Sequence, residues 1–306
     1  MLWPADRLNL VVYPTQIALT VAYRDELEMW WAWIAFDVLA IAVTMSVARA
    51  AMGVTFQRAA AMRVASMSVL IPLVFTQVGL IVEATAPTDL AAEVAALDDR
   101  MFAGVNPLEA LEGIAHPVLT ELMQWAYVLY LPLIPGIILL LAWRGSPEVT
   151  ARSLWSLQSI LFLSYVGYYL CPTSGPNIHS NLGPPGPCDL TPLSLYTFES
   201  DLPGVWLKDS FQRWAFAAEV TKWDCMPSAH VGVAIACAVY AFRLGRRWGL
   251  ALLPLCAAIV FSTVYLRYHY VVDAVAGAAL AWFCLVPWER LHRRFKPASF
   301  GRVRAI

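Results

Sequence analysis

Seven hydrophobic runs constrain the fold of this chain more than any other feature of its sequence. A transmembrane helix needs about 17–25 mostly apolar residues, and lipid offers the backbone no hydrogen-bond partner, so such runs cross bilayers as helices. We therefore predict an all-α integral membrane protein with seven crossings. The predicted crossings are Trp30–Ala48, Val64–Val82, Leu122–Trp143, Ser153–Leu170, Val231–Phe242 with its flanks, Leu250–Leu266 and Tyr270–Trp288.

The composition agrees with a membrane protein. Apolar residues make up 59% of the chain and charged residues 14%, whereas about a quarter of the residues in soluble proteins are charged. The net charge is −1 and no basic surface is evident, so we expect no nucleic-acid partner.

The predicted crossings divide the chain into three parts. Residues 1–63 hold the first crossing and the segment Leu8–Ala22, which is short and contains Pro14. We expect this segment to be an interfacial or re-entrant helix rather than a crossing or a cleaved signal peptide. Residues 64–289 hold the other six crossings and a long outer loop at 171–224, and residues 290–306 form a basic tail.

The basic residues favour one orientation of these crossings. With the amino terminus outside, most of the 21 Lys and Arg residues lie on the inner side, which the positive-inside rule assigns to the cytoplasm. We therefore predict a cytoplasmic carboxyl terminus and an outer loop that faces the periplasm, a lumen or the cell exterior.

The stretch from Ser262 to Asp273 places ionisable residues between two apolar runs, where such groups are expensive and usually functional. His269 and Asp273 are four residues apart, so on a helix they would lie on the same face. A carboxylate bonded to one imidazole nitrogen fixes the tautomer and leaves the other nitrogen available as a nucleophile or base. We therefore predict that these two residues act together.

A second cluster, Pro227-Ser-Ala-His230, precedes two consecutive crossings. An antiparallel pair of crossings returns the chain to the face that it left, so we expect His230 and His269 on the same side of the membrane. Two histidines and an aspartate are also possible metal ligands. A lipid transporter or binding protein is a further alternative, although the sequence has no obvious inverted repeat.

These residues resemble signatures of the type 2 phosphatidic acid phosphatase superfamily. Pro227-Ser-Ala-His230 is similar to its second signature, Pro-Ser-Gly-His, and the stretch from Ser262 to Asp273 is similar to its third, Ser-Arg-x5-His-x3-Asp. The resemblance implies a six-helix phosphatase-type bundle, here with one extra N-terminal transmembrane helix, and chemistry without a metal or another cofactor. It implies that His269 is the nucleophile, that Asp273 orients it and that His230 protonates the leaving oxygen.

The match departs from the superfamily pattern in two places. Thr263 replaces the arginine of the third signature, and the first signature, Lys-x6-Arg-Pro, is absent. In its place stands Gly167-Tyr-Tyr-Leu-Cys-Pro-Thr-Ser-Gly-Pro-Asn177, which is similar to the inositol phosphorylceramide synthase branch, whose members are phosphotransferases of sphingolipid metabolism. This likeness implies a membrane lipid phosphotransferase with a phospholipid or lipid-phosphate substrate and inositol or a lipid alcohol as a possible acceptor. A lipid phosphate phosphatase, with water as the acceptor, is the alternative.

The usual cationic phosphate ligands are missing, so the charge that holds a phosphate must come from other residues. Arg267 belongs to the third motif, and Lys222 stands just before the second. Ser228 and nearby backbone amides can donate to an anion at the start of a helix. Ser174 and Asn177, in the outer loop, are further candidate donors to a phosphate or a polar headgroup.

The outer loop 171–224 is rich in Pro and Gly, so we expect irregular backbone there. Disulfides form outside the cytosol, and a Cys188–Cys225 bond would clamp the loop to the catalytic segment.

A second outer segment follows the second crossing. Leu90, Val94, Leu97 and Met101 recur at helical spacing, which predicts an amphipathic helix on the membrane surface. A short helix should begin at Pro107, with Asn106 as its cap.

Overall fold

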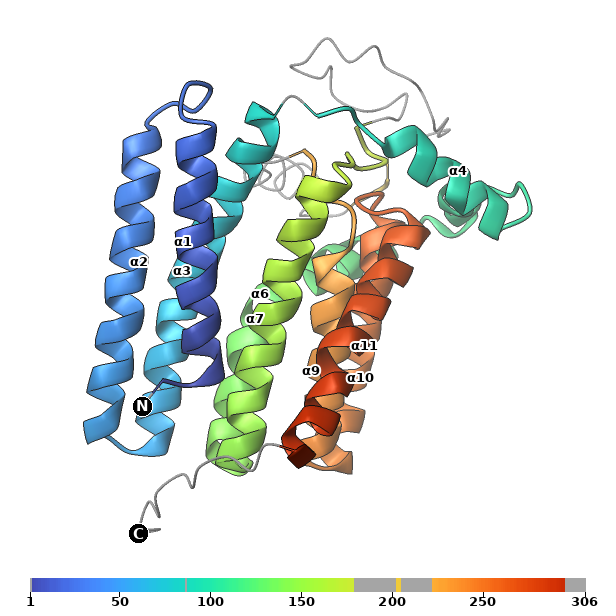
Figure 1. The fold of residues 1–306 in the computed structure, drawn as a ribbon. Coiled ribbons are helices and arrows are strands. Elements are labelled where there is room, and N and C mark those ends of the chain that lie inside the picture. Colours follow the sequence, from blue (N-terminus) through green and yellow to red (C-terminus); the bar gives the residue numbers. More distant parts are fainter. Residues whose placement is uncertain (1, 86, 179–201, 205–221, 295–306) are drawn as a thin grey trace.

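The computed structural model describes residues 2–85, 87–178, 202–204 and 222–294, and these residues form helices and turns with one isolated bridge between Thr173 and Asp224 (Figure 1). The helices are α1 (Pro4–Ala22), α2 (Trp30–Ala50), η1 (Ala51–Gly53), α3 (Phe56–Ala84), α4 (Ala91–Met101), α5 (Pro107–Ala110), η2 (Leu111–Ile114), α6 (Pro117–Arg144), α7 (Pro147–Leu170), α9 (Ala229–Leu244), α10 (Arg246–Tyr265) and α11 (Val271–Arg294). The predicted all-α fold is confirmed.

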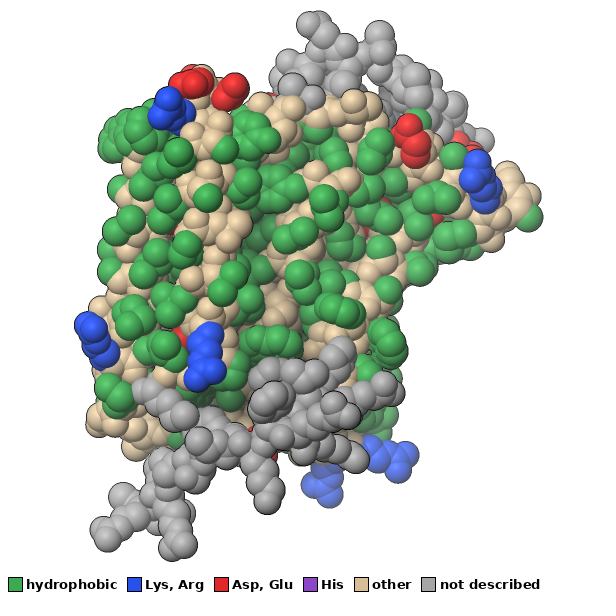
Figure 2. All heavy atoms as spheres, viewed as in Figure 1, with side chains coloured by type: hydrophobic (Ala, Val, Ile, Leu, Met, Phe, Trp, Pro, Cys, Tyr) green, Lys and Arg blue, Asp and Glu red, His purple; other side chains and the backbone are tan. Residues whose placement is uncertain are grey.

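The long helices lie side by side in a bundle (Figure 1). Four of the described helices are long and apolar enough to cross a membrane, namely α2 with η1, α3, α6 and α10. Hydrophobic side chains cover most of the face drawn in Figure 2, and the charged side chains visible there lie mainly toward the two ends of the bundle. Because a bilayer presents an apolar core between two polar surfaces, this distribution is that of an integral membrane protein.

Helix α1 lies within the bundle, which differs from the interfacial position that we predict from its sequence. It runs alongside α2 and also packs against α7 (Figure 1). Its buried face is mainly polar and includes Asp6, Asn9, Tyr13, Gln16 and Thr20. The mean hydropathy of a segment averages over all faces of a helix. A helix with a polar inner face therefore has a low mean hydropathy even when its outer face is apolar.

Paired polar groups hold α1 in this position. Arg63 of α3 donates to Asp6 over 2.8 Å, and both side chains are buried. Gln77 of α3 donates to Thr20 over 3.0 Å and to Asp37 of α2 over 2.8 Å. Buried charged and polar groups persist in a membrane bundle when they have such partners.

The position of α1 also moves the amino terminus. Figure 1 places it at the end of the bundle where α2 turns into α3 and α6 turns into α7. Arg49, Arg58 and Arg144 lie in the helix ends beside those turns. The amino terminus therefore lies at the basic end of the protein, whereas the orientation predicted above placed it at the opposite end.

Candidate active site

The second and third motifs meet at the other end of the bundle. Helix α9 begins at Ala229, α10 ends at Tyr265 and α11 begins at Val271, so both motifs lie where the chain enters or leaves a helix. The ring centroids of His230 and His269 are 5.7 Å apart. The prediction that the two histidines emerge on one face is confirmed.

Two glycines allow the helices to approach the second motif closely. A Cβ atom on Gly167 of α7 would lie 2.2 Å from Cδ of Pro227, and one on Gly277 of α11 would lie 2.3 Å from the carbonyl oxygen of Ser228. Real Cβ contacts are never this short, so only glycine permits this packing. The backbone N–H of Ser228 also donates to the carbonyl oxygen of Asp273 over 3.1 Å, which joins the two motifs directly.

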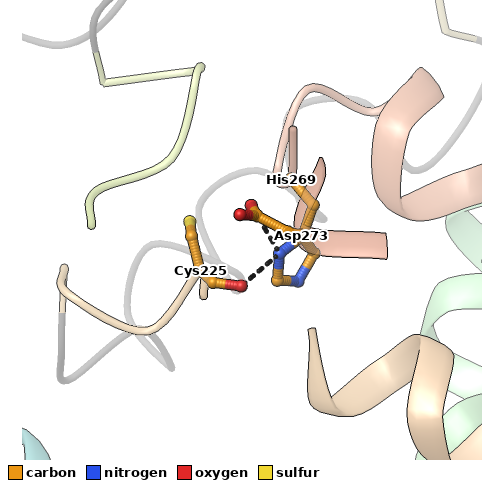
Figure 3. A group of neighbouring side chains, drawn as sticks. All are labelled: Cys225, His269 and Asp273. Carbon is orange, nitrogen blue, oxygen red and sulfur yellow. Dashed lines mark hydrogen bonds and ion pairs between the residues drawn. The ribbon is translucent and has the colours of Figure 1, made fainter. Parts of the chain in front are cut away.

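The imidazole of His269 lies between two hydrogen-bond acceptors (Figure 3). Its Nδ1 is 3.1 Å from the carbonyl oxygen of Cys225 and 3.4 Å from Oδ2 of Asp273. Because both partners accept, they favour a hydrogen on Nδ1 and leave Nε2 unprotonated. Asp273 is itself fixed by the backbone N–H of Tyr270, which donates to Oδ2 over 3.0 Å. His269 lies in the turn before α11 rather than on the helix, but the predicted contact with Asp273 is present.

Aromatic rings of α6 hold His230. Its ring centroid is 4.5 Å from that of Tyr127, with the rings stacked, and 4.2 Å from that of Tyr130. Tyr127 also stacks on Tyr268, with centroids 5.0 Å apart. No motif in the sequence pointed to these tyrosines, because their role depends on how α6 packs against α9.

A cavity of about 560 Å³ opens beside the two histidines. Its walls are mostly apolar and come from α3, α6 and α7, including Ile71, Phe75, Ile134 and Leu161. His230, His269, Tyr268 and Asp224 also line it. An apolar cavity with a few convergent polar groups is the usual form of a small-molecule site.

The structure gives Arg267 a protein partner. Its Nη2 is 3.0 Å from Oε1 of Glu112 in η2, and it does not line the cavity with His269. Its backbone is left-handed, with φ of 66°, and its carbonyl oxygen accepts from the N–H of Asn177 over 2.9 Å. The third motif and the outer segment 171–178 are therefore connected through this residue.

The other predicted phosphate ligands, Ser228, Ser174 and Lys222, differ in the groups that they contact. The hydroxyl oxygen of Ser228 caps α9 by accepting from the N–H of Val231 over 3.4 Å. The Ser174 hydroxyl donates to Asp89, whose other carboxylate oxygen accepts from the Ser174 N–H over 3.1 Å. Lys222 is half-buried two residues before Asp224. Ser228 and Ser174 thus have structural contacts that sequence spacing did not reveal.

The sulfur of Cys225 is 3.2 Å from the carbonyl oxygen of Tyr268. Cys188 lies outside the described residues, so the Cys188–Cys225 bond stays a prediction. One ligand-type atom from each of Cys225, His269 and Asp273 lies within 4.8 Å of the others, so the metal alternative has a geometric basis.

The outer segment after α3 contacts the site through acidic residues. Both carboxylate oxygens of Asp98 in α4 accept backbone N–H groups at the start of α11, from Val271 over 2.8 Å and from Val272 over 2.7 Å. Burial raises the pKa of the Asp98 carboxyl, and these two hydrogen bonds oppose the rise. Asp98 acts as an N-terminal cap supplied from another helix, and Asp89 and Glu112 add the contacts to Ser174 and Arg267.

Helix α4 confirms the predicted helix, but one of its acidic residues lies on the buried face. Ala91, Val94, Ala95 and Asp98 form its buried face, whereas the side chains of Leu97 and Met101 are 41% and 50% exposed. The amides of α11 supply what a buried carboxylate needs, so Asp98 faces inward. The predicted Asn106 cap is confirmed, since its Oδ1 accepts from the N–H of Leu108 over 3.0 Å.

The fold and the site define a class: a helical membrane protein in which two histidines and an aspartate meet beside an apolar cavity. The chain matches the family model described as the PAP2 superfamily over residues 92–286, more than half of its length. It belongs to this superfamily, that of the type 2 phosphatidic acid phosphatases, whose membership supports a phosphatase-type enzyme acting on phospholipid or lipid-phosphate substrates in a membrane. Neither a search of curated proteins nor a search of solved structures gave a match.

Proposed function

We propose that this protein is a lipid phosphotransferase that moves a phosphoryl group or phospho-headgroup through a phosphohistidine at His269, at the outer leaflet of the membrane. The observation that carries the proposal is that His230 and His269 line one cavity whose remaining walls are mostly apolar. Such walls suit the acyl or alkyl part of a lipid, while the histidines suit its phosphate.

In the first half-reaction, Nε2 of His269 attacks the donor phosphorus. The N–P bond forms, the bond from phosphorus to the leaving oxygen breaks, and the leaving oxygen takes a proton from His230. Asp273 and the Cys225 carbonyl hold the Nδ1–H and stabilise the positive charge that develops on the ring.

In the second half-reaction, an acceptor hydroxyl gives its proton to His230. The hydroxyl oxygen bonds to phosphorus, the N–P bond breaks and His269 returns to its starting form. His230 thus serves as acid in one step and as base in the other.

The transition state spreads negative charge over the phosphoryl oxygens, so it requires positive groups. Within the described part of the chain, no Lys or Arg lines the cavity. Arg267 and Lys222 are the proposed sources of charge, with Arg267 exchanging Glu112 for the substrate phosphate.

Transfer to an alcohol is favoured over hydrolysis by a physical argument. A transferase must bind an alcohol where a phosphatase binds water, and the apolar cavity walls disfavour water. Thr263, the stretch from Gly167 to Asn177 and the long loop 171–224 lean the same way. A lipid phosphate phosphatase is the second candidate, because about 560 Å³ is room for several waters of about 30 Å³ each beside a headgroup.

Purified protein should be given a mass-tagged phospholipid or lipid phosphate with and without inositol or a long-chain alcohol. A new phosphate ester of the alcohol supports transfer, a phosphodiester when the donor is a phospholipid and a phosphomonoester when the donor is a lipid phosphate. Inorganic phosphate as the sole product across the acceptor panel, with rapid turnover of a simple lipid phosphate, identifies a phosphatase. Loss of activity with EDTA, restored by added metal, would favour the metal alternative. Cysteine labelling of intact cells at positions 180 and 245 would test which side of the membrane each position faces.

A further inference from the structure

The described wall of the cavity contains one carboxyl group, that of Asp224, and the proposed mechanism does not use it. Asp224 is half-buried and lines the same cavity as His230 and His269. It directly precedes Cys225, whose carbonyl oxygen holds the imidazole of His269. A titratable group in this position faces whatever molecule occupies the cavity.

The backbone at Asp224 is fixed by the neighbouring segment. Thr173 and Asp224 form a parallel bridge, and the N–H of Cys225 donates to the carbonyl oxygen of Thr173 over 3.2 Å. Thr173 lies three residues after the end of α7, and its own side chain is buried. The backbone that carries this carboxyl group is therefore held at a defined place, as a binding residue requires.

The surroundings of Asp224 contain hydroxyl groups and a histidine. Tyr165 and Tyr168 of α7 also line the cavity and lie close enough to Asp224 to interact with it electrostatically. Burial raises the pKa of the Asp224 carboxyl to about 6, while a positive charge on His269 opposes the rise and the charge on Asp273 adds to it.

This chemistry does not suit a phosphate. A carboxylate in a poorly solvated site repels an anion, whereas it accepts a hydrogen bond from a hydroxyl group. Tyrosine hydroxyls can donate as well as accept. This part of the cavity thus matches an alcohol or polyol hydroxyl.

We propose that Asp224, with Tyr165 and Tyr168, forms the subsite for the hydroxyl group of the acceptor alcohol. The carboxylate accepts the hydrogen bond of that hydroxyl and turns its oxygen toward the phosphorus on His269. As the oxygen bonds to phosphorus, the hydroxyl hydrogen turns from Asp224 to His230, which takes the proton as in the proposed phosphoryl transfer, on which this inference rests. Asp224 accordingly determines how strongly an alcohol is preferred over water.

The test measures how the phosphoenzyme divides between alcohol and water. Full-length wild-type protein and Asp224→Asn, in vesicles of a neutral phospholipid, receive a labelled short-chain lipid phosphate with glycerol or 1-octanol. The ratio of phosphorylated alcohol to inorganic phosphate is the readout. The amide oxygen of asparagine still accepts, but without the negative charge that makes such a hydrogen bond roughly twice as strong, so we expect the ratio to fall about tenfold. Asp99→Asn, at an exposed carboxyl of α4, is the matched control and should keep the wild-type ratio.

A ratio that stays within twofold in Asp224→Asn overturns the inference. Loss of labelled phosphoenzyme in the same variant also overturns it, because Asp224 would then act in the first half-reaction through His269. If Asp224→Asn does not fold, Asp224→Glu gives the same measurement, since one added methylene displaces the carboxylate from the hydroxyl. A lowered ratio there supports the subsite, and an unchanged ratio removes it.

Failure of the proposed phosphotransferase function would give a different result from failure of the acceptor subsite. In the first case the wild-type protein itself forms no phosphohistidine from any lipid phosphate. If the wild-type protein forms it and transfers to alcohol, while Asp224→Asn transfers equally well, then only the acceptor subsite is wrong.

Discussion

Arg267 and Glu112 are joined across the outer end of the protein, with Nη2 of the arginine 3.0 Å from Oε1 of the glutamate. The arginine is buried and the glutamate is half-buried. The residue that we propose as a phosphate ligand is thus already bound to an anionic group of the chain. A carboxylate and a phosphate are both favourable partners of a guanidinium, so they compete for it.

Glu112→Gln should therefore lower the KM for a lipid phosphate. The amide oxygen can still accept from Arg267, but the negative charge that competes with the substrate is gone. We expect a decrease of about three- to tenfold, since charge-assisted hydrogen bonds are roughly twice as strong as neutral ones. Steady-state kinetics with a short-chain lipid phosphate measure this, and an increased KM would show that Glu112 positions Arg267 instead of competing for it.

Asp98→Asn should reduce kcat more than it changes KM. Asp98 does not line the cavity, but its two hydrogen bonds to the start of α11 position the helix that bears Asp273. An amide has a single acceptor oxygen, so one of the two N–H groups loses its partner, at a cost of about 1–3 kcal/mol. Kinetics and thermal unfolding in detergent test this beside the exposed control Asp99→Asn, and equal behaviour of the two variants would refute it.

The histidine pair gives a prediction about leaving groups. His269→Ala and Asp273→Asn should abolish turnover in folded protein, because each removes the oriented nucleophile. His230→Ala should lose most of its activity toward alkyl phosphates and less toward an activated aryl phosphate, which needs no proton to leave. Vanadate, which mimics five-coordinate phosphorus, should inhibit. Full activity of His269→Ala would end the phosphohistidine mechanism.

Gly277→Ala should destabilise the protein. Its Cβ would lie 2.3 Å from the carbonyl oxygen of Ser228, and such overpacking typically costs about 1–3 kcal/mol. Gly136→Ala in α6 is the matched control, because a Cβ there meets nothing within 4 Å and alanine favours a helix by about 0.5–1 kcal/mol. Thermal unfolding should separate the two variants, with Gly277→Ala lower and Gly136→Ala unchanged or higher.

The ratio of alcohol transfer to hydrolysis should rise with pH through about 6. The pKa of Asp224 is raised to about 6, and the carboxyl accepts a hydrogen bond best when ionised, so transfer weakens as the pH falls below this value. His269, Asp273, Tyr165 and Tyr168 also interact electrostatically with Asp224. His269 and Asp273 serve both reaction paths, so they affect the ratio little, and a tyrosine hydroxyl ordinarily titrates near pH 10, well above this range. Asp224→Asn should give a flat profile, and the same slope in that variant would assign the titration to another group.

Local pattern was sufficient for much of the fold and for the meeting of the two motifs. The seven apolar runs all fall on helices of the structure, because lipid forces the backbone to form its hydrogen bonds within each segment, and four of the described helices are long and apolar enough to cross a membrane. The spacing of His269 and Asp273 predicted their contact, and the antiparallel crossings between them predicted that His230 would join them. Each of these inferences needs only neighbours along the chain or the hydropathy of one segment.

The tertiary structure decided which partners those residues have. The polar face of α1 lowers its hydropathy, so the sequence argues against a position in the bundle. In the structure, Arg63 and Gln77 are hydrogen-bond partners of polar side chains on that face. An acidic residue such as Asp98 would ordinarily face solvent. It is buried because two N–H groups at the start of α11, 173 and 174 residues away in the sequence, donate to its carboxylate. Hydrogen bonds between distant segments leave no periodicity in the sequence, so the capping of α11, the Arg267–Glu112 pair and the position of Asp224 in the cavity follow from the packing of the helices alone.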